Sequence, residues 1–520
     1  MLEALLLQRI AYGIKPNELA RLKEIGFEAY IDEQLSPVDA EDAELLKVLK
    51  SYKVEAEFKK NGRQVKETWG LDYLNADNKK LWTLYQNRKE LSHQEKNRPS
   101  GEVVIATWLR ALYSKWQLRE IIVDFWNNHF NISIDAHDAM PILLPIHDRE
   151  VIRKHALGNF KDFLIAVAKS PCMLYYLDNA LSKASPANEN YARELFELHT
   201  LGAKHYFNHL YNRWREVPGA LEGKPEGYID EDVYEAARAF TGWTVADGRH
   251  DEKGGHLPDT GEFYYFEGWH DNYQKRVLGV EFNSNQAPME DGLKVLELVA
   301  YHPATAYHIC YKLCRRLVED EPNEGLVKQA AALWLAQKEA PDQIKQVIRF
   351  ILTHKAFKAS LGTKVKRPPE LIFSYLRSLG GNFMPNQHLF WMFAISGYRY
   401  FAWPTPTGHP DTAEYWLNSS MLLMRWNMMQ TLLEDWHKMM DIDLIALQPK
   451  AVRTCNEIVD FWIERLLGQA AKGETRLRLV NFLAAGGVED DIPYGEEREV
   501  KYRIYQMVTL LAMTPDFQYR

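Results

Sequence analysis

The chain has 520 residues, of which 46% are hydrophobic and 26% are charged, an ordinary composition for a soluble globular protein. This length exceeds one ordinary core and predicts two or three lobes, or one large helical domain with insertions. The net charge of −8 and the lack of a dense basic run argue against nucleic-acid binding. The longest apolar stretch, 388–403, is interrupted by Gly397 and Arg399, so we expect no membrane span.

The first residues and the cysteines bear on the cellular compartment. MLEALLLQRIAYG has a short apolar run, but its positive charge follows the run and no small-residue cleavage site is present. The absence of a visible signal predicts a cytoplasmic protein, whereas a leader removed earlier would make it periplasmic. Four cysteines, Cys172, Cys310, Cys314 and Cys455, are too sparse for a disulfide framework, and we expect them to be small core residues.

Most of the chain has the apolar periodicity of helices. We expect helical segments at 17–35, 39–60, 101–130, 148–170, 186–202, 231–241, 292–318, 324–336, 341–354, 368–379 and, with one interruption, 414–513. Residues 205–229 and 397–413 are predicted loops, because Gly, Pro and polar residues are frequent there. EFYYFE and RVLGVEF, inside the glycine- and aromatic-rich segment 244–292, are predicted short strands.

These elements predict a mainly α protein, with a large multi-helix body and a small irregular or β-containing insertion. We expect an N-terminal helical region at 1–243, the insertion at 244–291 and a C-terminal helical region at 292–520. The two helical regions are expected to pack as one unit.

The segment 186–202, PANENYARELFELHTLG, is the most informative part of the chain. As a regular helix capped by Ser185 and starting at Pro186, it is apolar almost all round, which is typical of a buried helix. One arc of about 100° nevertheless carries four polar side chains, Asn190, Arg193, Glu194 and Glu197. Buried charge is costly unless it is paired, so this arc indicates either a site or a structural ion-pair network.

Two interpretations of the arc remain open. In the structural one, Arg193 pairs with Glu197 at i, i+4 and Glu194 bonds a neighbouring element. In the functional one, Glu194 and Glu197 project into a cleft, where one acts as acid or base or both bind a cation, with Arg193 and Asn190 setting charge and orientation. His199 falls on the opposite side of a regular helix, and the spacing E-x-x-E-x-H differs from the HExxH zinc motif.

Four further segments hold candidate residues. In DFWNNHFNISIDAHD, His129 lies on an apolar face where a helix ends among polar residues, and it is either a core residue or a ligand contact. Trp243 is either a core anchor or a stacking platform. His270 and Asp271 are either an exposed loop pair or part of a site. The loop PTPTGHPDTAEYW is rigid by its Pro and Gly content, and Asp411 is expected to cap the following helix.

The chain resembles the bacterial family called domain of unknown function 1800 over nearly its whole length. The matching segments, in order, are LLLQRIAYGIKPNEL, FWNNHFNIS, MLYYLDNALS, NENYARELFELHTLGA, DVYEAARAFTGWTV, FEGWHDNYQKRVLG, HPATAYHICYKLCRRLVED, KVKRPPELIFSYLRSLG and TGHPDTAEYWLNSSMLLMRWN. The chain departs from the family pattern in DAHDAM after FWNNHFNIS and in the longer loop at 205–229.

The resemblance implies a largely helical fold with an unassigned biochemical role. Many members look exported, often beside partners that bear twin-arginine leaders, whereas this chain begins directly at the family's LLLQRIAYG segment. NENYARELFELHTLG is close to the family signature. By resemblance, the positions of interest are His129, Asp178, Asn188, Asn190, Arg193, Glu194, Glu197 and His199.

The leading hypothesis is an enzyme that performs acid–base or metal-assisted chemistry in a cleft between 188–199 and 126–138. Its predicted catalytic residues are Glu194, Glu197 and His129, and its predicted substrate-binding residues are Asn190, Arg193, Asp178, Trp243 and His270. The many Trp and Tyr residues favour hydrolysis of a sugar-containing or other small-molecule substrate, and a divalent metal is a possible cofactor. The alternatives are a non-catalytic binding or assembly protein with a protein partner, and a metal-dependent oxidoreductase.

Overall fold

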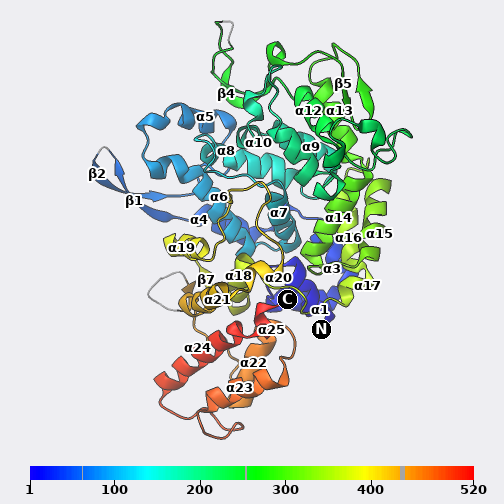
Figure 1. Cartoon of the computed structure of the whole chain (residues 1–520). Helices are drawn as coiled ribbons and strands as arrows, with labels where there is room; N and C mark the ends of the chain where they lie inside the picture. Colours follow the sequence, from blue (N-terminus) through cyan, green and yellow to red (C-terminus); the bar gives the residue numbers. More distant parts are fainter. Residues whose placement is uncertain (61, 252–253, 434–439) are drawn as a thin grey trace.

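The computed structural model describes residues 1–60, 62–251, 254–433 and 440–520 (Figure 1). Residues 252–253 of the predicted insertion and 434–439 of the predicted C-terminal helical region lie outside the described residues. The fold is mainly α with small antiparallel two-stranded sheets, which confirms the predicted fold class.

The N-terminal part is helical with one hairpin; η denotes a 3-10 or π-helical turn. Its helices are α1 (Leu2–Ile10), α2 (Pro16–Ile25), α3 (Phe27–Gln34), η1 (Asp39–Glu41), α4 (Ala43–Ser51), α5 (Asn78–Gln86), η2 (Arg88–Glu90), α6 (His93–Tyr113) and α7 (Gln117–His129). The predicted helix at 39–60 is wrong beyond Ser51, because β1 (Val54–Lys60) pairs antiparallel with β2 (Arg63–Trp69). Val54, Ala56 and Phe58 alternate with charged residues, which is the period of a strand.

The middle of the chain contains short helices and two π-helical turns. They are α8 (Met140–Ile146), η3 (His147–Arg153), α9 (Phe160–Lys169), α10 (Pro171–Tyr176), η4 (Asn179–Leu181), α11 (Asn190–Glu194), η5 (Leu195–His199), η6 (Ala203–His205), η7 (Asn208–Leu210), η8 (Trp214–Glu216) and α12 (Asp230–Ala239). The π turns are η3 and η5. The predicted regular helix at 186–202 is therefore wrong at its start and in its second half.

The insertion forms two small sheets. β3 (Trp243–Asp247) pairs with β4 (Asp259–Tyr265), η9 (Glu267–Trp269) follows, and β5 (Lys275–Val277) pairs with β6 (Val280–Phe282). The strand predicted from EFYYFE is confirmed as β4, whereas RVLGVEF forms the β5–β6 hairpin instead of one strand.

The C-terminal half is again helical. Its elements are α13 (Glu290–Ala300), α14 (Pro303–Leu317), α15 (Glu324–Ala336), α16 (Gln343–Thr353), α17 (Lys355–Lys358), α18 (Pro368–Leu379), β7 (Asn382–Phe383), α19 (Gln387–Ile395), α20 (Ala413–Trp416), α21 (Ser419–Leu432), β8 (Met440–Asp441), α22 (Cys455–Leu467), α23 (Gly473–Ala484), α24 (Glu497–Met513) and α25 (Pro515–Gln518). The two ends of the chain lie near each other beside α1 and α25 (Figure 1).

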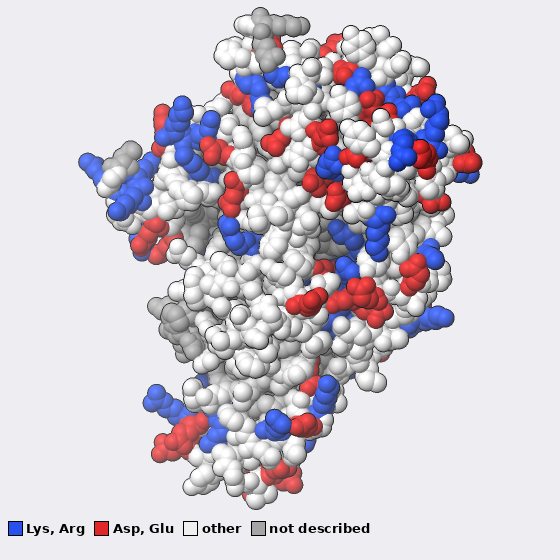
Figure 2. Space-filling model, viewed as in Figure 1, with Lys and Arg blue, Asp and Glu red and all other residues white. Residues whose placement is uncertain are grey.

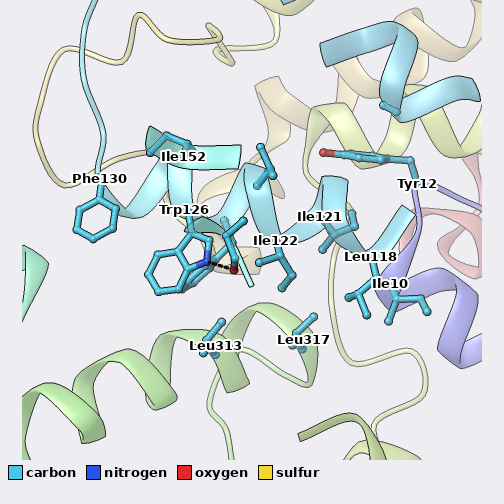
Figure 3. Close-up of a cluster of buried hydrophobic side chains, with 14 of the residues drawn as sticks. Ile10, Tyr12, Leu118, Ile121, Ile122, Trp126, Phe130, Ile152, Leu313 and Leu317 are labelled. Atoms are coloured by element: carbon cyan, nitrogen blue, oxygen red, sulfur yellow. Dashed lines mark hydrogen bonds between the residues drawn. The ribbon is translucent and has the colours of Figure 1, made fainter. Parts of the chain in front are cut away.

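Buried side chains from α1, α7 and α14 share one hydrophobic core. Figure 3 shows Leu313 and Leu317 of α14 in one cluster with Trp126 and Ile122 of α7. Trp126 also donates from its indole N–H to the carbonyl of Ala156 at 3.0 Å. This packing brings the C-terminal end of α7 against the middle of α14, which positions the site described below.

On the face shown in Figure 2, Lys and Arg side chains lie among Asp and Glu, and a broad uncharged area occupies the centre. None of the helices in the described ranges has the length and apolar character that a membrane span requires.

Candidate functional site

The helix in the signature segment begins later than predicted and changes from α-helical to π-helical. α11 begins at Asn190, and from Leu195 to His199 the chain forms the π turn η5. Tyr191, Leu195 and Phe196 are buried, whereas Glu194 and Glu197 are half-buried. The predicted cap is also wrong, because the residue before the first helical position is Glu189 and not Ser185.

Glu194 and Glu197 lie close enough to interact electrostatically. Burial, and then the negative charge of Glu197, raise the pKa of Glu194, while Arg193 opposes the shift. Across the described residues, neither carboxylate accepts a hydrogen bond or forms an ion pair. The predicted Arg193–Glu197 pair is wrong, because Arg193 contacts Glu189 at 3.0 Å and Asp230 at 3.6 Å.

The remaining predicted substrate-binding residues lie in two places. The Asn190 amide donates to Asp178 at 3.4 Å, on the exposed side of α11. Trp243 is fully buried at the start of β3, and His270 is buried as well. His270 contacts the carbonyl of Thr241 at 2.9 Å and the carboxylate of Asp291 at 3.3 Å, so the expected exposed His270–Asp271 pair belongs instead to a buried polar network.

The end of the π turn positions two histidines from other parts of the chain. Nε2 of His129 lies 3.2 Å from the carbonyl oxygen of His199, and Nε2 of His308 lies 3.2 Å from the carbonyl oxygen of Leu198. The last carbonyls of a helix have no partner within it, so they are free to accept these bonds. Because a carbonyl only accepts, both Nε2 atoms carry the proton and both Nδ1 atoms are left as acceptors.

Lys312 donates a hydrogen bond to Nδ1, the acceptor atom of His129. Its ammonium Nζ lies 2.9 Å from Nδ1 of His129 and donates to it. Burial, the charge of Lys312 and the neighbouring histidines hold the pKa of His129 well below its usual value, so the imidazole is neutral. The hydrogen bond therefore joins Lys312 of α14 to His129 of α7. The carbonyl of His199 orients the His129 ring for it.

A cavity of about 420 Å³ opens beside this pair. It is lined by the end of α7, residues 201–205, one face of α14 and the loop 407–411. Small-molecule sites commonly have volumes of roughly 300–1,000 Å³, so this cavity has the size of a metabolite site. His129 lines it, whereas Glu194 and Glu197 are not among its lining residues.

The charge of the cavity wall is predominantly positive. Lys204, Lys312 and Arg315 line it together with one carboxylate, Asp411. Burial lowers the pKa of Lys312 to about 8, an effect that Asp411 opposes. An amine with this pKa releases its proton near neutral pH far more readily than an exposed lysine does.

Asn128, in the last turn of α7, holds the loop 404–412 in place. The Asn128 side chain donates to the carbonyl of His409 at 2.9 Å and accepts from its N–H at 2.7 Å. Gly408 has φ +72°, and a Cβ there would lie 2.2 Å from the Asn128 carbonyl oxygen, so the close approach needs glycine. The predicted Asp411 cap of the next helix is wrong, because Asp320 accepts from Ala413 N–H and Asp411 lies 3.5 Å from Lys364.

A buried ion network lies one helical turn from the Lys312–His129 pair. Arg316 contacts Asp124 at 3.2 Å and also pairs with Glu370, and Arg367 bridges the same two carboxylates. These side chains are almost fully buried. This network is separate from the one predicted for 190–197, and it includes Arg367 of the segment KVKRPPE.

Sequence reasoning missed His308 and Lys312. The available signal was their i, i+4 spacing, with Tyr311 and Arg315 on the same side of a helix whose other side is apolar. No group of three or more His, Cys, Asp and Glu side chains arranged to hold a metal ion is found among the residues that the structure describes.

Comparison with known proteins gives a family and no function. No curated protein and no solved structure matches the chain. The model of one family, described as a protein of unknown function, matches residues 5–519. This match covers both α7 and α14, the helices that form the cavity. The chain therefore belongs to the family of proteins of unknown function called DUF1800.

Proposed function

We propose that the protein is an enzyme that moves protons on a small anionic substrate bound in the cavity between α7 and α14. The observation that carries this proposal is the 2.9 Å contact between Nζ of Lys312 and Nδ1 of His129 at the cavity wall. Lysines with a pKa of roughly 7–8 are suited to acid–base work because both protonation states are populated near neutral pH. Lys312 is the acid–base group and His129 the residue that positions it.

The preference for an anion follows from the charges of the wall. Lys204, Lys312 and Arg315 exceed Asp411 in number, while Asp411 is itself near Lys364 and Arg315 pairs with Glu321 at 3.0 Å. Neutral imidazoles of His129 and His308 add polarity without adding charge. A substrate carboxylate or phosphate near Arg315 and Lys312 would gain charge-assisted hydrogen bonds in a partly enclosed site.

A screen in D₂O tests this proposal. Carboxylated and phosphorylated compounds are incubated with the protein, and NMR follows both product formation and deuterium uptake. We expect turnover of at least one compound, its loss in Lys312→Met, and retained binding without turnover in Lys312→Arg, which keeps the charge but does not release a proton. Lys328→Met on the exposed side of α15 is the control. Equal turnover in the Lys312→Met variant would refute the role of Lys312.

A second candidate is the glycoside-type hydrolase that uses Glu194 and Glu197. It is favoured by one observation, the raised pKa of a half-buried Glu194 next to a second carboxylate. The variants Glu194→Gln and Glu197→Gln are assayed against a glycoside panel, with Glu222→Gln at an exposed turn as the control. Turnover that survives in both variants removes the two carboxylates from the mechanism.

A third candidate, a binding or assembly protein, is favoured by the same positive cavity if no substrate is turned over. In that case a compound from the screen binds, Lys312→Met weakens its binding, and no chemical change or deuterium uptake follows.

A further inference from the structure

A second cavity adjoins the first. Its volume is about 370 Å³, and residues 224–226 and the first turn of α14 line it. His205 and Tyr307 line both cavities. The two cavities therefore meet at these side chains, and together they are larger than a single small metabolite requires.

One face of α14 forms the floor of both cavities. Ala304, Tyr307, His308, Tyr311, Lys312 and Arg315 line one or the other of them. Their spacing of three and four residues places them on one side of the helix. With a rise of 1.5 Å per residue, the floor from Ala304 to Arg315 is about 16 Å long.

Hydrogen bonds hold the wall of the second cavity against this floor. Nε2 of His302 lies 2.8 Å from the carbonyl oxygen of Pro225, and Nδ1 of His302 accepts from the N–H of Ala304 at 3.1 Å. Nδ1 of His205 donates to the carbonyl of Glu226 at 2.9 Å. The groove is therefore built into the fold before any ligand arrives.

The chemistry along the groove alternates between flat aromatic rings and spaced charges. The rings of Tyr307 and Tyr311 are inclined by only 14°, with centroids 6.3 Å apart. Lys312 and Arg315 lie toward one end and Lys224 lies at the other. Each cavity also has one carboxylate in its wall. Asp411 lines the first cavity with Lys312 and Arg315, and Glu226 lines the second with Lys224.

This pattern favours one class of ligand. Carboxylates in the wall repel a densely charged anion such as a polyphosphate, but they accept hydrogen bonds from hydroxyl groups. The Tyr311 ring is covered by the Arg315 guanidinium at 4.8 Å and the Lys204 ammonium at 5.5 Å, so the Tyr307 ring is the apolar face for a ring-shaped group. A chain of sugar rings with widely spaced carboxylates matches the separated cations, the hydrogen-bonding carboxylates and the aromatic face of the groove.

We propose that the substrate is an acidic oligosaccharide that spans both cavities, with one carboxylate at Lys312 and Arg315 and at least one further sugar ring across Tyr307 toward Lys224. This inference rests on the proposed function, since it assigns the reacting end of the ligand to Lys312. Beyond the proposed function, the substrate is assigned a length of more than one sugar ring, and the second cavity is assigned as the subsite for the additional rings.

Calorimetric titration of the full-length protein with galacturonate and its dimer, trimer and tetramer tests this inference. We expect affinity to increase about tenfold or more from the monomer to the trimer, equivalent to about 1.4 kcal/mol, because the added rings enter the second cavity. Neutral oligomers of glucose of the same lengths are expected to bind at least tenfold more weakly.

Two variants distinguish this inference from the proposed function. Lys224→Glu changes an exposed side chain and is expected to remove most of the gain with length while leaving monomer binding unchanged. Tyr307→Leu is expected to weaken the trimer more than the monomer. Lys312→Met is expected to weaken every acidic length.

Each result has a defined consequence. Equal affinity for monomer and trimer, or an unchanged length dependence in Lys224→Glu, overturns the second cavity as a subsite and leaves the role of Lys312 standing. Failure of every galacturonate length to bind overturns the assignment to acidic sugars. Unchanged binding of all lengths in Lys312→Met overturns the placement of the reacting end and, with it, the proposed function.

Discussion

Nζ of Lys312 donates a hydrogen bond of 2.9 Å to Nδ1 of His129, although 183 positions separate the two residues in the chain. One lies on α14 and the other at the end of α7. Each helix also contributes to the buried network one turn away, where Arg316 contacts Asp124 at 3.2 Å. From the first contact to the second, the residue numbers rise along α14 and fall along α7. The two helices therefore pack antiparallel, and this packing fixes the Lys312–His129 pair.

Lys312 is expected to cost the protein stability at neutral pH. Its pKa in the folded chain is about 8, below the usual lysine value, so the unfolded chain binds more protons between these values and stability rises with pH there. Lys312→Met removes the buried charge, and the free energy of unfolding at pH 7 is expected to increase by about 1–3 kcal/mol, less the bond lost with His129.

Urea unfolding at pH 7 and pH 9.5 measures this effect. The gain in Lys312→Met is expected to shrink at the higher pH, whereas Lys328→Met, which removes an exposed lysine, changes stability by less than about 0.5 kcal/mol. A gain that is independent of pH contradicts a titrating Lys312.

Gly202 is expected to tolerate no side chain because of His308. Its φ is +89°, and a Cβ would lie 2.7 Å from Nδ1 of His308. Gly26 has a nearly identical φ of +88° with nothing within 4 Å of a Cβ, so it is a matched control. Backbone strain costs about 1–3 kcal/mol at either site. Gly202→Ala is expected to lose more than Gly26→Ala in denaturant unfolding, and equal losses would show that His308 moves aside freely.

Thr200 is expected to stabilise the π turn that orients the histidines. Its hydroxyl donates to the carbonyl of Leu195, and its side chain is fully buried. Thr200→Val keeps the shape but leaves that carbonyl without its side-chain donor, which costs about 1–2 kcal/mol. Nitrogen NMR of the imidazoles of His129 and His308 is expected to show loss of the single tautomer. Unaltered tautomers in a destabilised Thr200→Val would limit this residue to a structural role.

Glu370 is expected to be the most sensitive member of the buried network. Three arginines, Arg316, Arg367 and Arg520, lie within ion-pair distance of its carboxylate. Glu370→Gln leaves Arg316 and Arg367 to share Asp124 and removes the carboxylate near Arg520, and a loss of about 3–5 kcal/mol is expected. The exposed pair Glu474–Arg478 supplies the control, because Glu474→Gln is expected to cost less than about 0.5 kcal/mol.

The pH dependence of Glu370 follows from the same contacts. Despite burial, the surrounding arginines hold its pKa well below the usual range. The stability that Glu370 contributes is therefore fully present above the pKa that this group has in the unfolded chain. It is lost as the pH falls toward the lower pKa of the folded chain. Acid unfolding of Glu370→Gln is expected to depend less on pH than that of the unaltered protein, and identical slopes would contradict this account.

The apolar periodicity was enough to predict a mainly α fold and a small β-containing insertion. It failed at 54–60, where a two-residue period was read as a helix, and at 195–199, where the side-chain pattern alone does not reveal a π turn. The first error reflects pairing with β2, which the periodicity of 54–60 does not show, and the second reflects local hydrogen bonds such as that from Thr200 to the carbonyl of Leu195.

The sequence by itself determined which helices bury which faces, because that depends on residues three and four apart. It also pointed to His129 and to the signature segment 190–199. Only the tertiary structure decided that the carbonyls of Leu198 and His199 accept hydrogen bonds from His308 and His129, since backbone groups leave no trace in the residue pattern. Lys312 was likewise assigned to His129 only by the packing of α7 against α14, because a contact across 183 positions is not encoded in either helix alone.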